Sequence, residues 1–239
     1  MDMSTAELRR LHRTRRSSLT FRGKPTTKLE TVSVTTCEGK TAKPCGSFVY
    51  LGTLTSPDVS ATPEVRRRIG MGLSSFGNLN KLWKTKSVSD RTKARLYKAL
   101  VLSIMLYNSE IWTIKTRDLK ALEGAHFRMM RSMMNLREQT NASRASLQQA
   151  FHLHDIADYI RQKRLRWIGH ALRRHDQDRS KISVLDTLAD SAFAWTRLVQ
   201  QDCAIAGITL DSLPKIAMDR SKFQRTTHVC SGRFCGLLL

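Results

Sequence analysis

Arginine and lysine are the side chains whose spacing in this sequence points most clearly to a chemistry, the binding of phosphate groups. Residues 161–174 (RQKRLRWIGHALRR) carry most of their cations away from an apolar stripe. That stripe consists of Ile160, Trp167, Ile168, Ala171 and Leu172, at spacings typical of one face of a helix. A helix with this pattern would bury the stripe in a core and offer its charge to an anionic partner.

The whole chain shares this basic character. Its 239 residues include 41 Lys and Arg but only 20 Asp and Glu, for a formal net charge of +21. Such an excess is typical of proteins that bind nucleic acid, because phosphates neutralise the self-repulsion. A membrane surface is the competing anion, but no long apolar run accompanies the charge, so no membrane partner is expected.

Individual phosphate contacts are harder to assign, because many cations on such a face would be only solvated. The predicted nucleic-acid-binding residues are Arg66, Arg67, Lys93, Arg95, Arg161, Lys163, Arg164, Arg166, Arg173 and Arg174. They would bind phosphates and give little direct sequence readout. Trp167 could stack on a base, although its place beside Ile168 favours core packing.

Residue types that bind metals or carry acid–base chemistry are present but poorly arranged. His152 and His154 with Asp155 offer metal ligands without a completed set, so a polar turn at a helix start is favoured. His228, Cys230 and Cys235 have spacing outside the usual zinc patterns. Asp176 and Asp178 are separated by one residue and fit a polar loop after a helix. No metal site and no catalytic residue is therefore predicted.

Several other polar or adaptable side chains fit structural roles better than chemical ones. Glu110 lies among apolar residues and would need a cationic partner such as Arg128 or Arg131. His170 fits a packed or hydrogen-bonded histidine better than a general base. The methionines at 129, 130, 133 and 134 are most simply core filler.

The elements that would position these residues are mostly helices. Apolar residues three or four apart predict one helix from Glu64 through Trp83. Further helices are expected from a Ser89 cap to Ile111, from a Thr116 cap to Met133, from Ser143, and over 155–174. Another is expected over 183–204, and a last short one near Asp211 and Ser212.

The first part of the chain has a different character. Residues 5–28 are a basic arm that could be simply solvated, could bind phosphates, or could carry a nuclear-import signal. Residues 29–36 and 48–51 are short strand candidates, the second ended by Gly52. The start lacks a signal-peptide pattern, and the five scattered cysteines favour a reducing compartment, so an intracellular location, nuclear or cytoplasmic, is expected.

A series of short segments resembles the region just after the polymerase core of non-LTR (LINE-type) retrotransposon reverse transcriptases. The segments that carry this resemblance are 48–52 (FVYLG), 68–69 (RI), 82–83 (LW), 92–97 (TKARLY), 105–112 (MLYNSEIW), 122–128 (LEGAHFR), 164–170 (RLRWIGH), 217–220 (AMDR) and 222–223 (KF). Each is weak alone, but their order and spacing over residues 48–223 make the resemblance fairly specific.

The resemblance implies a helical thumb and the region beyond it, which grip the template–product duplex. Reverse transcriptases hold two divalent metals with clustered aspartates, including a Tyr-x-Asp-Asp turn. This sequence has no two adjacent acidic residues anywhere. We therefore expect a polymerase fragment that is inactive alone, without a cofactor of its own, since Mg²⁺ would belong to a palm outside the chain.

The predicted fold is mainly α, a helical bundle-like thumb preceded by a short β element from the edge of a palm. The expected domains are a basic N-terminal arm (1–28), the β element (29–62), a helical thumb-like domain (63–181) and a helical C-terminal segment (182–239). A continuous cationic strip, and a shared interior for Trp83, Trp112 and Trp167, are expected of this arrangement.

The expected function is binding of RNA, an RNA–DNA hybrid or DNA through phosphate contacts, with the remaining polymerase domain as a further possible partner. The alternative is a non-catalytic helical scaffold remnant with no specific ligand, in which the charge is inherited but not used. Substitution of the arginines of 161–166 separates the two hypotheses, because only the first predicts a loss of binding.

Overall fold

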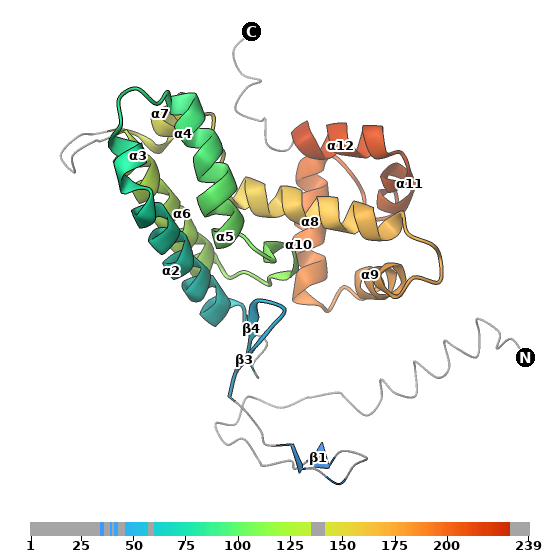
Figure 1. Ribbon diagram of the computed structural model, residues 1–239. Helices are drawn as coiled ribbons and strands as arrows, with labels where there is room; N and C mark the ends of the chain where they lie inside the picture. Colours follow the sequence, from blue (N-terminus) through green and yellow to red (C-terminus); the bar gives the residue numbers. More distant parts are fainter. Residues whose placement is uncertain are drawn as a thin grey trace, which may run out of the picture. The chain divides into compact units, whose positions relative to one another are not determined.

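The protein is mainly α-helical with a short β element, as the sequence predicts (Figure 1). The computed structural model describes residues 34–35, 39, 41–42, 46–56, 60–134 and 142–229. The chain divides into Met1–Ser47 and a compact unit, Phe48–Leu239, that holds all the described helices. The predicted basic arm lies outside the described residues, and the four predicted domain boundaries stay predictions.

Two small antiparallel hairpins make up the described β structure. In the first unit β1 (Val34–Thr35) pairs with β2 (Thr41–Ala42). In the second unit β3 (Phe48–Tyr50) pairs with β4 (Thr53–Thr55). Leu51 and Gly52 connect β3 to β4 with φ of 46° and 79°, as a tight two-residue hairpin turn requires. Strands β2 and β4 are not predicted from the sequence, because each is too short to show an alternating pattern.

The helix predicted from Glu64 to Trp83 is two helices, α2 (Thr62–Asn78) and α3 (Asn80–Lys84). The chain bends at Leu79, which lets the indole of Trp83 turn back on the end of α2. Its Nε1 donates a hydrogen bond of 2.8 Å to the Phe76 carbonyl, and its ring stacks on the Phe76 ring with centroids 5.0 Å apart. Periodicity alone could not reveal the break, since both helices keep the same apolar spacing.

The next helical stretch begins where predicted, with the Ser89 side chain accepting the Thr92 amide. It comprises α4 (Asp90–Tyr97), a π-helical turn η1 (Lys98–Leu102) and α5 (Ser103–Met105), with a short 3₁₀ turn η2 (Ser109–Ile111) afterwards. The helical stretch ends at Met105, earlier than the predicted Ile111, and Asn108, at φ 56°, precedes η2.

Two more helices complete the first half of this unit. Helix α6 (Thr116–Met133) begins at the predicted residue, although Thr116 is its first helical residue and not its cap. Helix α7 (Arg144–Phe151) begins next to Ser143, as predicted, and the Ser143 side chain caps it by accepting the Ser146 amide. The first apolar cluster lies among α2 to α8 and includes Trp83, Tyr97, Trp112 and Met129, Met130 and Met133. Met134 is exposed, so the methionines are core filler except for this one.

The second half of the unit is built on α8 (Ile156–Leu172), which the sequence predicts within two residues at each end. The predicted helix over 183–204 is two helices, α9 (Arg179–Ala189) and α10 (Ala194–Ala206), with a turn at Asp190. Helix α11 (Leu213–Met218) matches the short helix predicted near Asp211. Helix α12 (Arg220–Val229) was not predicted, since its few apolar residues leave only a weak pattern.

The second apolar cluster lies among α8 to α12 and is separate from the first. Trp167 packs against it, with its ring perpendicular to that of Trp195 at 6.0 Å between centroids. Core packing of Trp167 is therefore confirmed. The prediction that Trp83, Trp112 and Trp167 share one interior is wrong in part. Trp83 and Trp112 belong to the first cluster, whereas Trp167 packs against the second.

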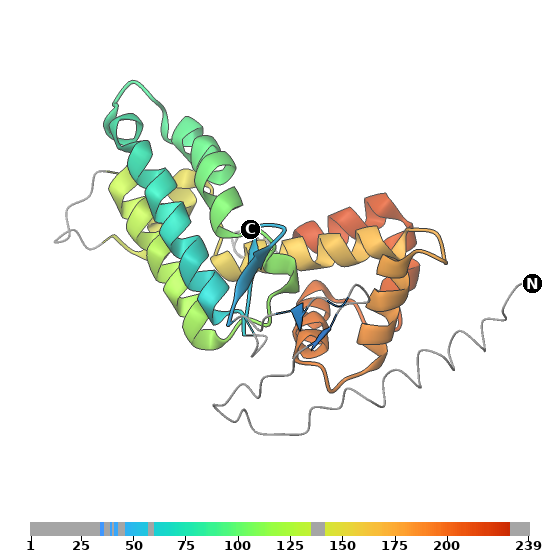
Figure 2. The ribbon, with the colours of Figure 1, turned by 60° about the horizontal axis from the view of Figure 1, so that its bottom comes forward.

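Gly169 and Phe223 show why the sequence of α8 matters to the second cluster. A β-carbon added at Gly169 would lie 2.3 Å from Cε1 of Phe223, well inside van der Waals contact. The glycine therefore lets α12 pack directly on the backbone of α8, and these two helices are in contact (Figures 1 and 2).

Helix α8 also joins the two clusters through its contacts with η2. The Trp195 indole donates a 2.9 Å hydrogen bond to the Glu110 carbonyl. Lys163 donates a 2.6 Å hydrogen bond to the Leu106 carbonyl and lies 3.3 Å from the Glu110 carboxylate. Glu110 thus has a cationic partner, as predicted, but the partner is Lys163 and not Arg128 or Arg131.

None of the helices in the described part of the chain is both long and apolar enough to cross a membrane.

Candidate nucleic-acid interface

Three of the predicted phosphate contacts are exposed and unengaged. Arg66 on α2, Arg95 on α4 and Arg166 on α8 are exposed, and none makes an ion pair or side-chain hydrogen bond within the described residues. Each directly follows a buried apolar residue of its helix, Val65, Ala94 or Leu165, while its own side chain is exposed. An unpaired guanidinium of this kind can offer paired donors to a phosphate.

Arg164 differs from Arg166 although only one residue separates them. It is 2% exposed, and its guanidinium donates to the Asp202 carboxylate of α10. Arg161 contacts the same carboxylate at 3.5 Å and also pairs with Asp158. Burial raises the pKa of Asp202, although the two arginines oppose that effect. Arg164 and Arg161 therefore tie α8 to α10, a role that the sequence hides because Asp202 is far along the chain.

The cations nearer the ends of α4 and α8 are also engaged within the protein. Lys93 is buried and lies 3.9 Å from Asp90. Arg173 donates a 2.8 Å hydrogen bond to the Ala217 carbonyl and lies over the ring of Phe223. Arg174 is exposed and pairs with Asp178 at 3.1 Å. Together with the ion pair of Lys163, these contacts leave Arg174 and Lys163 only partly accessible to a ligand.

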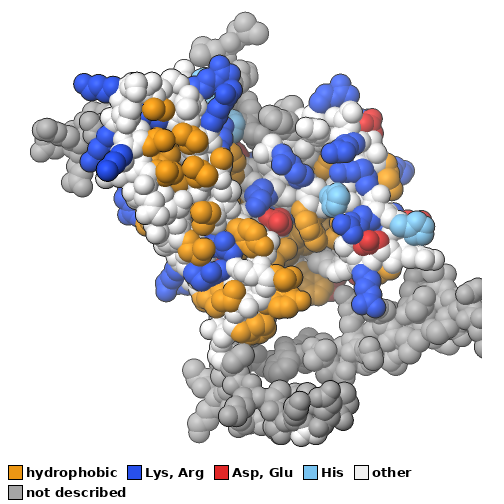
Figure 3. Space-filling model, in the orientation of Figure 1, with side chains coloured by type: hydrophobic (Ala, Val, Ile, Leu, Met, Phe, Trp, Pro, Cys, Tyr) orange, Lys and Arg blue, Asp and Glu red, His pale blue; other side chains and the backbone are white. Residues whose placement is uncertain are grey.

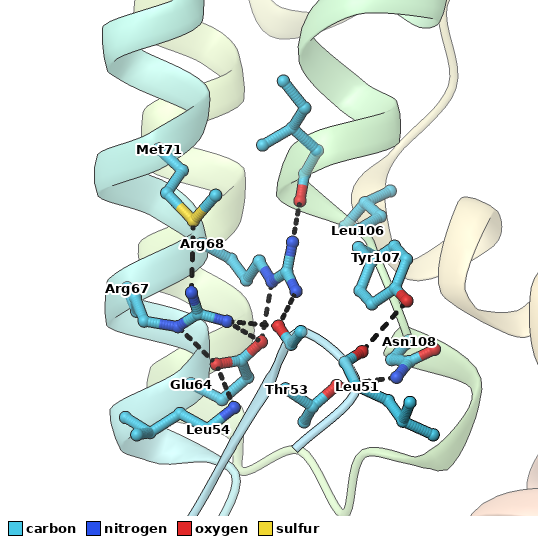
Figure 4. A network of polar contacts seen from close by, with 12 residues as sticks. Leu51, Thr53, Leu54, Glu64, Arg67, Arg68, Met71, Leu106, Tyr107 and Asn108 are labelled. Atoms are coloured by element: carbon cyan, nitrogen blue, oxygen red, sulfur yellow. Dashed lines mark hydrogen bonds and ion pairs between the residues drawn. The ribbon is translucent and has the colours of Figure 1, made fainter. Parts of the chain in front are cut away.

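Arg67 takes part in a polar cluster that fixes the β3–β4 hairpin to α2 (Figure 4). The buried Glu64 carboxylate accepts hydrogen bonds from Arg67 (2.8 Å), Arg68 (2.7 Å) and the Leu54 amide (2.9 Å). Both guanidiniums also donate to the Gly52 carbonyl. Burial tends to raise the pKa of Glu64, but these hydrogen bonds outweigh it and hold the pKa below its usual value.

The other side of the hairpin is held by the loop after α5 (Figure 4). The Tyr107 hydroxyl donates to the Leu51 carbonyl at 3.1 Å, and Asn108 donates to the Thr53 hydroxyl at 2.6 Å. The Arg68 guanidinium lies 4.4 Å from the centroid of the Tyr107 ring. Segments 48–52, 68–69 and 105–112 thus converge on one cluster, which the sequence could not reveal because their contacts are long-range.

On the face shown in Figure 3, the Lys and Arg side chains do not form the continuous cationic strip that the sequence predicts. There the Lys and Arg side chains stand in separate groups, divided by uncharged and apolar surface, while acidic side chains are few. A ligand on this face would therefore be held by several spaced contacts and not by one unbroken stripe.

Buried titratable groups lie between α4, α6 and α7. The Tyr97 hydroxyl lies 2.8 Å from Nδ1 of His126, whose Nε2 lies 3.2 Å from the His154 carbonyl. A neutral imidazole satisfies both contacts if Nε2 carries the proton and Nδ1 accepts from Tyr97. Burial lowers the pKa of His126 to about 4. Neutral His126 is therefore part of the core and not an acid–base group at neutral pH.

Acidification is expected to destabilise the protein through His126. Because its folded pKa lies below the ordinary value of 6.5, the unfolded chain takes up the proton first, and stability present above pH 6.5 is lost toward pH 4. The expected loss between pH 7 and pH 5 is about 2 kcal/mol. Urea unfolding at both pH values measures it, and His126→Gln should reduce the difference. An equal pH dependence in both proteins would contradict this assignment.

The side chains considered for metals or acid–base chemistry have structural contacts. His152 ends α7, Asp155 accepts a 2.7 Å hydrogen bond from Gln148, and Asp178 caps α9. The hydrogen bonds from Ser180 and Arg174 lower the pKa of Asp178 to about 2. His170 is exposed and its Nε2 is hydrogen-bonded to the Arg174 guanidinium at 3.4 Å, so of the two predicted roles it is hydrogen-bonded and not packed in the core.

Within the described ranges no three His, Cys, Asp or Glu side chains are grouped as a metal site would require. Cys230 and Cys235 lie outside those ranges, so the predicted absence of zinc at the tail stays a prediction.

The chain is similar to an uncharacterised transposon-derived protein of Caenorhabditis elegans. The two are 24% identical over 135 residues, which are 54% of this chain and 47% of the relative. The match thus spans about half of the relative's length. No family model and no solved structure matches the chain. The similarity indicates a transposon-related origin for this protein.

Proposed function

We propose that this protein binds nucleic acid through phosphate contacts and descends from the thumb region of a non-LTR retrotransposon reverse transcriptase. The observation that carries the binding proposal is the charge balance. Even if every Asp and Glu were paired with a Lys or Arg, the excess cations that make up the net charge of +21 would have no acidic partner in the chain. Phosphates are the anions that most often neutralise such an excess. The similarity to a transposon-derived protein supports the proposed origin.

The preferred ligand is RNA or an RNA–DNA hybrid, bound without direct reading of bases. Arg66, Arg95 and Arg166 are proposed as contacts because they are exposed and unpaired within the described structure. The remaining predicted contacts are proposed to act mainly inside the protein, with Arg174 and Lys163 as partial exceptions. The chain alone is proposed to be inactive as a polymerase, because its sequence lacks the adjacent aspartates of that chemistry.

The second candidate function is a helical scaffold without a specific ligand. The engagement of Arg161, Arg164 and Arg173 in internal contacts favours it, since these cations serve the fold. The two candidates differ in whether the exposed arginines contribute to binding.

A triple variant tests the proposal. Arg66→Gln, Arg95→Gln and Arg166→Gln together should weaken RNA affinity and make the negative slope of log affinity against log salt shallower by about 2 to 3, because three counterion-releasing contacts are lost. The matched control removes the same charge from exposed residues of α11 and α12, with Lys215→Gln, Lys222→Gln and Arg225→Gln. Fluorescence anisotropy with a labelled RNA measures both. Equal slopes for the unsubstituted protein and the first variant would favour the scaffold.

A further inference from the structure

Helices α4 and α7 are in contact (Figure 1). A cavity of about 390 Å³ lies between α4 and the end of α7. Its lining residues are Arg91, Ala94, Arg95, Lys98, Phe151 and His152. We call this cavity the arginine pocket. Arg91, Arg95 and Lys98 follow one another at spacings of four and three residues, which places them along one side of the helical stretch.

The charges of the arginine pocket are not balanced within the protein. The lining holds no acidic side chain, and neither Arg91 nor Arg95 makes an ion pair within the described residues. Like charges at this spacing repel each other on a helix. Burial lowers the pKa of Lys98, whose ammonium donates a 3.0 Å hydrogen bond to the His152 carbonyl. A bound anion would relieve this repulsion, which no group of the lining does.

The rest of the lining is uncharged and partly aromatic. Ala94 and Phe151 form its apolar part, and both are buried in the first cluster, so their positions are fixed. His152 ends α7 in a left-handed conformation, with φ 49° and ψ 46°, which places its carbonyl toward Lys98. The cavity volume is within the range of small-ligand sites. Because Ala94 is 3% and Phe151 is 1% exposed, the surface open to a ligand is mainly that of the cationic side chains, which fits an anionic group.

We propose that the arginine pocket binds one phosphate group of a nucleic-acid strand, held by the exposed Arg91 and Arg95 beside His152. Two guanidiniums suit a phosphate because each can donate paired hydrogen bonds to its oxygens. This inference rests on the proposed function and adds a defined subsite to it. Arg91 was not among the residues predicted from the sequence, because the cavity depends on α7, far along the chain.

Adenosine 5′-monophosphate, inorganic phosphate and adenosine are the probes that test the pocket. Isothermal titration calorimetry at low salt should show binding of the monophosphate and of phosphate, and no binding of adenosine at the same concentrations. Arg91→Gln with Arg95→Gln should weaken monophosphate binding at least about tenfold, since two charge-assisted contacts are lost. Lys84→Gln with Lys86→Gln removes the same charge outside the pocket and should leave monophosphate binding within about twofold.

The same preparations separate this inference from the proposed function. Binding of a labelled RNA without binding of the monophosphate would overturn the pocket and leave the proposed function standing. A loss of monophosphate affinity that is equal in the two double variants would also overturn the pocket, because charge alone would explain it. Absence of both RNA and monophosphate binding would overturn both proposals.

Discussion

Arg164→Gln is expected to lower the free energy of unfolding by about 3–5 kcal/mol, the usual cost of removing one partner from a buried ion pair. The Asp202 carboxylate would lose the guanidinium that lies against it in a site where Arg164 is 2% exposed. Arg161, at 3.5 Å, would be its remaining cationic partner. Because burial already raises the pKa of Asp202 and Arg164 opposes that effect, the substitution should raise this pKa further.

Arg166→Gln is the matched control, since it removes the same charge from the same helix at an exposed position. Its free energy of unfolding should stay within about 0.5 kcal/mol of the unsubstituted protein. Urea unfolding at pH 7 compares the two. Similar stabilities for both variants would show that the Arg164–Asp202 contact does not hold α8 to α10, whereas a large loss for Arg164→Gln alone confirms it.

Gly169→Ala should cost about 3 kcal/mol, at the upper end of the range for overpacked cores. The added methyl group would meet the Phe223 ring at 2.3 Å from Cε1, so α12 must move away from α8 or the ring must leave its position. Phe223 is 3% exposed and part of the second cluster, so either change opens that cluster.

Gly124→Ala, at another helical glycine, is expected to raise the stability of the protein instead of lowering it. An added β-carbon there would have no heavy atom within 4 Å, and alanine should stabilise α6 by about 1 kcal/mol through its higher helix propensity. Thermal unfolding of both variants measures the difference. If Gly169→Ala proved as stable as Gly124→Ala, the close packing of α12 on α8 would be wrong.

The helices were largely predictable because their apolar residues recur at helical spacing and the cap at Ser89 is a local signal. The breaks between helices at Leu79 and Asp190 could not be predicted from the sequence, because they depend on how the side chains that follow each break pack in the folded chain. Helix α12 was also missed. It is stabilised by the contact of Phe223 with Gly169, which a local pattern cannot show.

The candidate interface was predictable in kind but not residue by residue. The basic composition and the alternation of cationic and apolar faces identify helices with exposed charge. They do not distinguish Arg166 from Arg164, because the difference comes from Asp202 on another helix. The arginine pocket was missed for a similar reason, since His152 meets α4 only in the folded chain.

The salt dependence of RNA affinity tests the central claim most directly. Phosphate binding by the exposed arginines predicts that log affinity falls linearly with log salt, with a slope of about −0.7 to −0.9 for each phosphate neutralised. A fluorescence anisotropy titration of the unsubstituted protein from about 50 to 200 mM salt measures that slope. A steep negative slope is the predicted result. An affinity that does not change with salt, or no binding at the lowest salt concentration, would contradict the claim.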